Sequence, residues 1–295
     1  MKKSVGILLI IISSVAYGFM PFVTKLTLNC GYNENTIIFV RCVISSLFLF
    51  IYIKNRKINY ILNKRDLTSI IKVSVFGYGL MILFFIKSFQ YIPTGISTAI
   101  NFNYPIAVML GSILFYNEKF DYKKLLITIA SIVGIYLIVG IGQINKLNLT
   151  GFILTFVSGL LYAYYILSIG NGTLRQINSV VLTFYISLIN IIPFFFASII
   201  SGNFSFEYSK IGLFYLLLIS IITPAGMILF NIGLGSVSAV STSIISTLEL
   251  IITLIVGVLF LKEVLYWNHI IGSMLIMTSV IFIAWIEQNS SSATS

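Results

Sequence analysis

Long apolar runs separated by short polar connections dominate the hydrophobicity pattern of the chain. A helix needs about 20 apolar residues to cross the hydrocarbon core of a bilayer, and lipid offers no hydrogen-bond partners to an irregular backbone. The pattern therefore predicts an all-α membrane protein with ten transmembrane helices. The predicted spans cover residues 4–27, 35–53, 68–89, 93–116, 122–141, 150–169, 178–200, 208–231, 237–261 and 266–286.

Two of these runs, 97–120 and 242–265, resemble each other. Each begins with small hydroxyl residues, and each ends close to a glutamate, Glu118 or Glu263, which we expect to cap or anchor the following helix. The offset of 145 residues between the two glutamates is kept without a gap over about half of the chain. The same offset relates Gly6 to Gly151, Ser13 to Ser158, Tyr17 to Tyr162, Phe39 to Phe184, Ile106 to Ile251 and Phe115 to Phe260.

This constant offset predicts two homologous halves. The first repeat covers residues 1–145, the second covers 146–287, and residues 288–295 form a disordered tail. Each repeat contains five spans, which is an odd number, so the two repeats must cross the membrane in opposite directions. Such inverted repeats are typical of alternating-access transporters.

Composition and charge support a membrane protein and argue against nucleic-acid binding. Hydrophobic residues make up 58% of the 295 residues and charged residues only 9%, whereas a soluble domain carries about 25% charged residues. The net charge of +10 comes from cations in short loops between apolar runs, where they act as topology signals. These basic loops alternate along the chain, which predicts a multi-pass protein of the cytoplasmic membrane with both termini in the cytoplasm.

The first apolar run also resembles a secretory signal peptide, with a weak cleavage site after Ala16. We favour a first transmembrane helix, because apolar residues continue through 17–23 and the second half repeats the segment.

Glu249 is the most informative polar residue, because it lies near the middle of the ninth span without an opposite charge close by in the sequence. A carboxylate at this depth is costly and should face the bundle interior or a wet cavity. There it could carry a proton or bind a substrate ammonium, or it could only hydrogen-bond neighbouring helices. Its repeat mate is Tyr104, followed by Pro105, which should interrupt the fourth span.

Other polar and aromatic residues could line the same cavity. Asn101 lies one turn before Tyr104, and Arg41 lies deep in the second span, where it could bind a substrate carboxylate or an internal acid. Tyr17 and Tyr162 occupy equivalent repeat positions, and aromatic faces can hold amines by cation–π contact. The alternative for these side chains is helix packing.

The chain contains little that suggests an enzyme. It has one histidine, no HExxH or CxxC motif and no phosphate-binding glycine-rich loop with a lysine. We therefore expect neither catalytic activity, nor a cofactor, nor a metal site.

Several stretches resemble the EamA-type ten-helix transporters of the drug/metabolite transporter superfamily. In SSVAYGFMPFVTKL, the pair Tyr17 and Gly18 precedes Lys25, as in the first span of that family. Arg41 resembles the family's second-span arginine, and residues 236–263 resemble its small-residue start, Leu-Glu step and terminal glutamate. Two positions depart from the family pattern, because Leu250 replaces the usual proline after the glutamate and Tyr17 replaces a commoner tryptophan.

The resemblance implies an inverted-repeat basket whose central cavity is lined mainly by spans 1, 3, 4, 6, 8 and 9. We expect a secondary transporter of small metabolites such as amino acids, amines or drugs, which exports by alternating access and could couple to protons. The chain would work in the lipid bilayer as a monomer or homodimer. The alternatives are an importer of an organic cation such as a choline-like nutrient, and a membrane scaffold or lipid-modifying enzyme.

Overall fold

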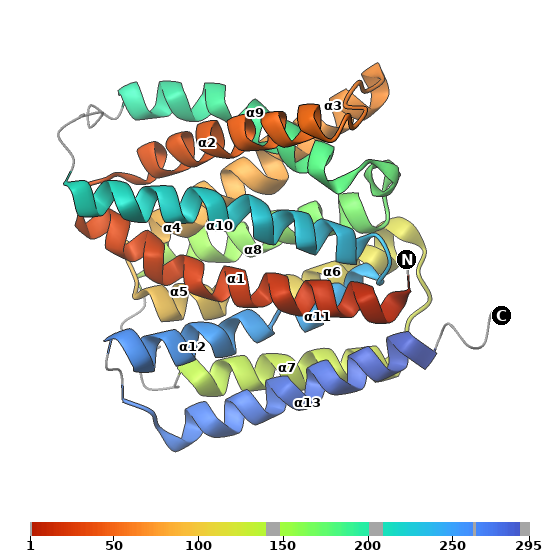
Figure 1. Ribbon diagram of the computed structural model, residues 1–295. Helices are drawn as coiled ribbons and strands as arrows, with labels where there is room; N and C mark the ends of the chain where they lie inside the picture. The colour runs from red at the N-terminus through yellow and green to blue at the C-terminus, as the bar shows by residue number, and fades with distance from the viewer. Residues whose placement is uncertain (1, 140–147, 201–208, 262–263, 290–295) are drawn as a thin grey trace.

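The computed structural model describes residues 2–139, 148–200, 209–261 and 264–289. These residues form a bundle of helices, without a strand among them, and the bundle confirms the predicted all-α class (Figure 1). Three sequence predictions lie outside the described residues: the role of Glu263, the repeat boundary at 145/146, and the tail over residues 290–295. The first two residues of the predicted tail, 288 and 289, continue the last helix.

Every predicted span corresponds to one helix or to two or three helices in line. Nine spans are long and apolar enough to cross a membrane within the described residues, and the 18-residue α7 matches the remaining predicted span. The elements are α1 (Lys3–Asn29), α2 (Glu34–Asn55), α3 (Lys64–Lys72), η1 (Val73–Leu80), α4 (Met81–Ser88), α5 (Thr94–Asn101), α6 (Tyr104–Tyr116), α7 (Tyr122–Val139), α8 (Leu149–Gly170), η3 (Thr173–Gln176), α9 (Ser179–Ile200), α10 (Lys210–Leu234), α11 (Ala239–Ile245), α12 (Leu248–Leu261) and α13 (Trp267–Asn289).

Two interhelical hydrogen bonds are equivalent under the 145-residue offset. The Ser13 hydroxyl in α1 donates to the Gly226 carbonyl in α10 at 2.9 Å. The Ser158 hydroxyl in α8 donates to the Met81 carbonyl in α4, also at 2.9 Å. Because both the donors and the acceptors are 145 residues apart, the two halves repeat the same helix contact, as expected of internal repeats.

The fourth and ninth spans are interrupted at equivalent places. Helix α5 ends at Asn101 and α6 begins at Tyr104, whereas α11 ends at Ile245 and α12 begins at Leu248. The 145-residue offset brings the two breaks into register within one residue. Both spans therefore present the beginning of a half-helix to the interior of the bundle.

The two breaks have different local causes. Pro105 lies in the first turn of α6, where a missing N–H costs nothing. The second break forms although Leu250 replaces the proline. There the hydroxyl of Ser246 donates to the carbonyl of Thr242 at 2.9 Å, and that of Thr247 donates to Ile244 at 2.7 Å. Such side-chain bonds compete with the helix backbone, so hydroxyl residues accompany the break in the second repeat.

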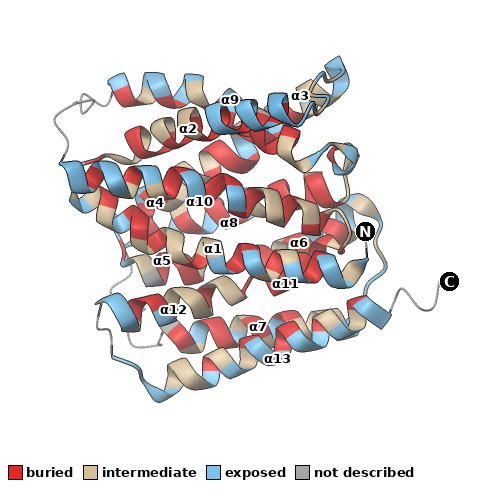
Figure 2. Cartoon of the chain, viewed as in Figure 1, coloured by how far each residue is buried: buried red, intermediate tan, exposed pale blue. Residues whose placement is uncertain are grey.

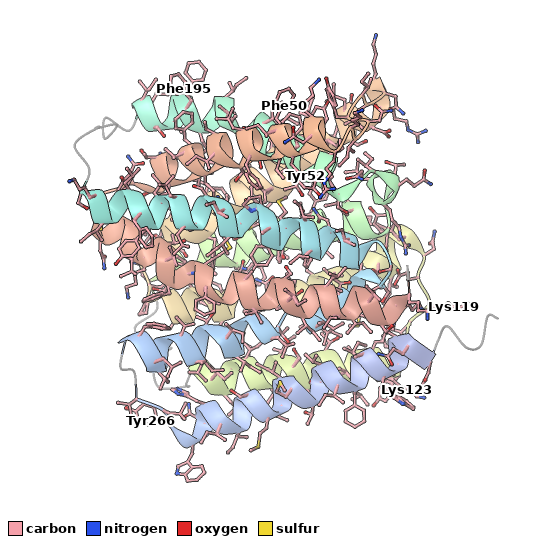
Figure 3. The ribbon with its side chains drawn as sticks, in the orientation of Figure 1. Phe50, Tyr52, Lys119, Lys123, Phe195 and Tyr266 are labelled. Atoms are coloured by element: carbon pink, nitrogen blue, oxygen red, sulfur yellow. The ribbon has the colours of Figure 1, made fainter. Side chains whose placement is uncertain are left out.

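The outer surface of the bundle is apolar, whereas its interior combines apolar side chains with buried polar ones. Every residue of α11 is buried, whereas α13, α9 and α2 expose long faces (Figure 2). Phe50 and Phe195 project outward from the α2 and α9 pair (Figure 3). Large exposed apolar side chains on the outside of a helical bundle are what a lipid-facing surface requires.

The basic connections collect at one end of the bundle. Lys119 and Lys123 lie at the end where α1 begins and α13 finishes (Figure 3). Glu118 does not cap the following helix, contrary to expectation. It accepts a 2.8 Å hydrogen bond from Asn171 at the end of α8, and Asp121 accepts the bonds from the first turn of α7 instead.

Candidate substrate cavity

A cavity in the centre of the bundle lies next to both helix breaks. It offers about 80 Å³ to water centres, several times the roughly 10–15 Å³ that one water needs. The spans that the resemblance implied all contribute to its wall, and α2 adds an arginine. The wall contains all six residues that the sequence singled out, which are Tyr17, Arg41, Asn101, Tyr104, Tyr162 and Glu249.

Arg41 brings a buried positive charge to this wall. Its side chain is among the largest fully buried ones, at 1% exposure. None of the three guanidinium nitrogens has a hydrogen-bond partner, although the group lies 5.7 Å from the centre of the Tyr78 ring. A buried charge without hydrogen bonds is costly, so the arrangement is suited to receive an anionic group from a ligand.

A π-helical segment, η1, positions the ring beneath Arg41. Tyr78 is flanked by Gly77 and Gly79 in this segment, and Asn190 in α9 donates to the carbonyl of Ser74 at 3.0 Å. Gly79 is required here, because an added Cβ would collide with the side-chain oxygen of Asn190. Single π-helical turns are frequent at functional sites.

Glu249 occupies the first turn of α12, directly after the second helix break. Its residue is half-buried, and it lines the cavity. The positive end of the helix dipole favours a carboxylate in this position. The one ion pair among the described residues joins Lys3 and Glu287. Glu249 and Arg41 therefore line the cavity without an ion-pair partner there.

Aromatic rings form much of the remaining wall. The rings of Tyr104 and Tyr162 meet edge to face, with centroids 4.8 Å apart. Tyr162 also lies parallel to Tyr165, whose hydroxyl donates to Asn231 at 2.9 Å. Tyr17 packs against α10, where an added Cβ at Gly226 would lie 3.3 Å from its ring.

The two asparagines at the first helix break have different surroundings. Asn101 is the last residue of α5 and lines the cavity, and its buried side-chain oxygen has no hydrogen-bond partner. Asn103 instead donates to the carbonyl of Phe156 in α8 at 3.1 Å. Asn101 therefore belongs to the cavity wall, whereas Asn103 belongs to a helix contact.

Sequence reasoning missed several apolar residues of the wall. Met20, Met81 and Met227 line the cavity together with Phe85 and Phe89. Nothing in their sequence context distinguishes them from core residues. The Gly-Tyr-Gly triplet around Tyr78 was the available signal for the π-helical segment.

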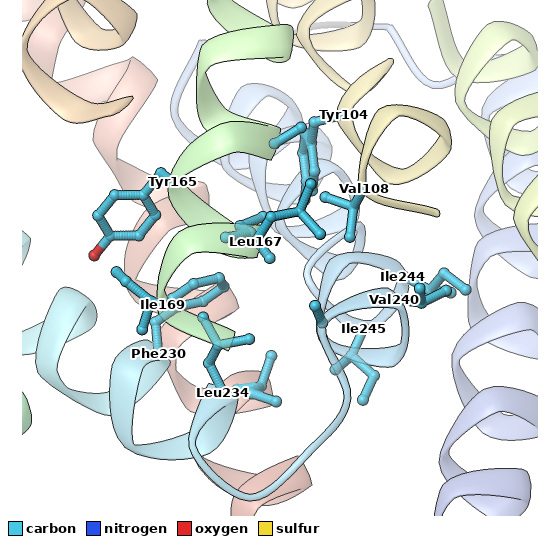
Figure 4. Close-up of a cluster of buried hydrophobic side chains, with 14 of the residues drawn as sticks. Tyr104, Val108, Tyr165, Leu167, Ile169, Phe230, Leu234, Val240, Ile244 and Ile245 are labelled. Carbon is cyan, nitrogen blue, oxygen red and sulfur yellow. The ribbon is translucent and has the colours of Figure 1, made fainter. Parts of the chain in front are cut away.

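Beside Tyr104 of the cavity wall lies a layer of buried aliphatic side chains, which we call the aliphatic seal (Figure 4). These side chains come from α6, α8, α10 and α11 and belong to one hydrophobic cluster. The seal consists of Val108, Leu167, Leu234, Val240, Ile244 and Ile245.

The end of the bundle where α1 finishes carries a second, polar hollow of about 580 Å³, which we call the vestibule. Lys25, Glu34 and Gln90 line it, and the amide of Gln90 donates to Glu34 at 3.1 Å. Phe89 lines both the vestibule and the central cavity. Phe89 thus lies on the boundary between the cavity and the vestibule.

Comparison with known proteins agrees with this architecture. The EamA-like transporter family matches the chain twice, over residues 4–140 and 149–285. An uncharacterized transporter, YxxF, of Bacillus subtilis (strain 168) is 28% identical over 233 residues, which is 73% of each chain. An uncharacterized transporter of Archaeoglobus fulgidus is 26% identical over 153 residues, or 52% of each chain.

A solved crystal structure superposes on 96% of the chain and 98% of its own length, with a TM-score of 0.80. Its sequence identity of 10% limits this likeness to the fold. The two family matches together cover most of the chain, and the named relatives indicate a membrane transporter. The chain belongs to the EamA-like transporter family, within the drug/metabolite transporter superfamily.

Proposed function

We propose that this protein is a secondary active transporter of a small zwitterionic metabolite of the amino-acid type. The carrying observation is the unpartnered guanidinium of Arg41 in the same cavity as Glu249. A substrate carboxylate would supply the hydrogen bonds that Arg41 lacks, while Glu249 would receive the substrate ammonium. A ligand with both charges would satisfy both groups without changing the net charge of the cavity.

The rest of the wall fits an apolar body between the two charged groups. Tyr17, Tyr104 and Tyr162 supply ring faces, and Asn101 supplies an unpartnered carbonyl oxygen. Mostly apolar walls with a few well-placed polar groups are typical of small-molecule sites. The free cavity is small, so the substrate would have to be small or the cavity would have to widen on binding.

The proposed mechanism is alternating access around this cavity, with residues 1–145 and 146–287 as the two repeats. The basic loops would place both termini in the cytoplasm, so the vestibule would face the outside of the cytoplasmic membrane. The proposed direction is outward, as in the exporters that the sequence resembles. Glu249 would exchange a proton when the substrate ammonium leaves, and one chain would form the transport unit, since it contains the complete cavity.

The alternative function is import of an organic cation. The carboxylate of Glu249 and the tyrosine rings favour a quaternary or primary ammonium equally well. A simple cation would leave Arg41 unpartnered and would bring a second positive charge into its cavity. This argument ranks the zwitterion first.

Thermal stabilisation of the purified protein tests the proposal, because a ligand that binds only the folded state raises the unfolding midpoint. The panel should contain matched sets of leucine, isoamylamine and isocaproate, and of phenylalanine, phenethylamine and 3-phenylpropionate. Each set keeps one apolar body and removes either charge. We expect stabilisation by the zwitterion to exceed that by either fragment.

Two variants test which protein group binds each charge of the ligand. Glu249→Gln should abolish the advantage of the zwitterion over the acid, and Arg41→Gln should abolish its advantage over the amine. If the amine stabilises the wild-type protein as strongly as the zwitterion does, the organic-cation reading replaces the proposal. If the ligands stabilise Glu249→Gln as strongly as they stabilise the wild-type protein, the binding site lies away from α12.

A further inference from the structure

A buried carboxylate outside the cavity joins three helices, α13, α1 and α11, at the end of the bundle where the chain begins. Glu287 lies in the last turns of α13 and is 4% exposed. One of its oxygens lies 3.3 Å from the ammonium of Lys3 in α1. The other accepts hydrogen bonds from the hydroxyls of Ser241 at 2.6 Å and Ser238 at 3.0 Å, and Lys124 of α7 lies 3.5 Å from the Ser238 hydroxyl.

These bonds hold the beginning of α11, the short half-helix before the second break. Ser238 is the N-cap of α11, and its backbone N–H also donates to Glu287 at 3.3 Å. Helix α11 carries Val240, Ile244 and Ile245 of the aliphatic seal. The carboxylate therefore fastens the half-helix that carries this part of the seal.

The equivalent half-helix of the first repeat is held without a carboxylate, by hydroxyl bonds from Ser97 of α5 to Ser88 of α4 and to Thr155 of α8. The 145-residue offset relates Ser238 to Pro93, which caps α5 without a side-chain hydrogen bond. Pro93 and Thr94 instead line the vestibule. Because the two repeats are inverted, α5 and α11 occupy equivalent positions at opposite ends of the cavity. The two ends therefore differ: one is sealed and fastened by a carboxylate, and the other is hollow.

We propose that Glu287, with Lys3, Ser238 and Ser241, is a latch that keeps the α11 end closed and so sets the balance between the two access states. The inference rests on the alternating access of the proposed function. Opening the α11 end requires α11 to leave α6 and α13, and that movement breaks the bonds from Ser238 and Ser241 to Glu287. A protein without the latch would spend more time open at that end and less time open at the vestibule.

Cysteine accessibility tests the latch without any substrate. The two native cysteines, Cys30 and Cys42, are first replaced by serine. Val240→Cys then reports on the seal, and Thr24→Cys reports on the cavity wall near the vestibule. A membrane-impermeant methanethiosulfonate reagent is applied from each side of the membrane, using cells and inverted vesicles.

Glu287→Gln should raise the labelling rate of Val240→Cys from the α11 end at least fivefold and lower that of Thr24→Cys from the vestibule end. Ser241→Ala removes one bond of the latch and should shift both rates in the same directions by a smaller factor, which keeps the test available if Glu287→Gln does not fold. Glu34→Gln is the matched control, because this partly buried carboxylate accepts a side-chain bond at the opposite end of the bundle, and the change should leave the labelling rate of Val240→Cys unchanged.

Unchanged labelling in both latch variants would overturn the proposal. A rise at both reporters would overturn it as well, since it would indicate general loosening and not a shift between two states. Because the readout involves no ligand, failure of the zwitterion panel and failure of the latch are separate results.

Discussion

Replacement of Arg41 by methionine separates a binding arginine from a structural one. Methionine keeps most of the length of the side chain and removes the charge. In a structural role the guanidinium would hold neighbouring groups, and its loss would destabilise the fold. The guanidinium nitrogens have no hydrogen-bond partner in the ligand-free protein, so the structure predicts a different result.

Arg41→Met is expected to change the stability of the protein and its affinity for the ligand in opposite directions. Loss of the contact with the Tyr78 ring costs about 0.5–2 kcal/mol. Removing an unpaired buried charge regains several kcal/mol of desolvation, so the unfolding midpoint of Arg41→Met should stay level or rise. A hydrogen bond to a charged group contributes about 1.5–3 kcal/mol. Ligand affinity should therefore fall about 10- to 150-fold, since about 1.4 kcal/mol corresponds to a factor of ten.

The assay combines thermal unfolding of the empty protein with a ligand titration of the same preparation. Arg41→Lys is the control, because it keeps the charge but loses the planar fork that binds a carboxylate through two bonds. A marked loss of stability in Arg41→Met would refute the reasoning, and so would unchanged affinity for the zwitterion.

Two further predictions concern the scaffold. Gly18→Ala should destabilise the protein by about 1–3 kcal/mol through overpacking, because the added Cβ would lie 2.5 Å from a side chain of α12; Gly235→Ala, with its nearest atom at 3.3 Å, should be tolerated. Ser13→Ala and Ser158→Ala should each lower the free energy of unfolding by about 0.6 kcal/mol, the average for such bonds in membrane bundles. If denaturant unfolding shows that the two variants differ from each other by more than about 1 kcal/mol, the two contacts are not equivalent.

Hydrophobicity predicted the fold because lipid restricts the choice of structure. Spans long enough to cross the membrane had to be helical, and the 145-residue offset located equivalent positions before any contact was known. What the pattern could not predict was the subdivision of the spans. The π-helical segment η1 is bound at its Ser74 carbonyl by Asn190, a residue 116 positions away in the sequence. The second break is accompanied by hydroxyl bonds at Ser246 and Thr247, residues that resemble ordinary helix packing in sequence.

The candidate site was predictable as far as charge and repeat symmetry could identify it. Glu249 and Arg41 stand out because charged residues are costly inside a membrane, and Tyr17 and Tyr162 stand out because they share a repeat position. The methionines of the wall carried no such signal. The role of Glu118 was predicted wrongly, because its position before α7 suggested a local cap while its partner Asn171 lies at the end of α8.

The positions of the two charges explain how a nearly symmetric scaffold can hold a substrate in one orientation. The offset relates Arg41 of the first repeat to Ile186, a fully buried core residue, and Glu249 of the second repeat to Tyr104. Each repeat therefore contributes one charge, and neither charge has a counterpart across the pseudo-twofold axis. A symmetric cavity would accept a zwitterion in two opposite orientations with equal energy. With Arg41 and Glu249 unpaired, the reversed orientation would place like charges together, so only one orientation is favourable in the proposed site.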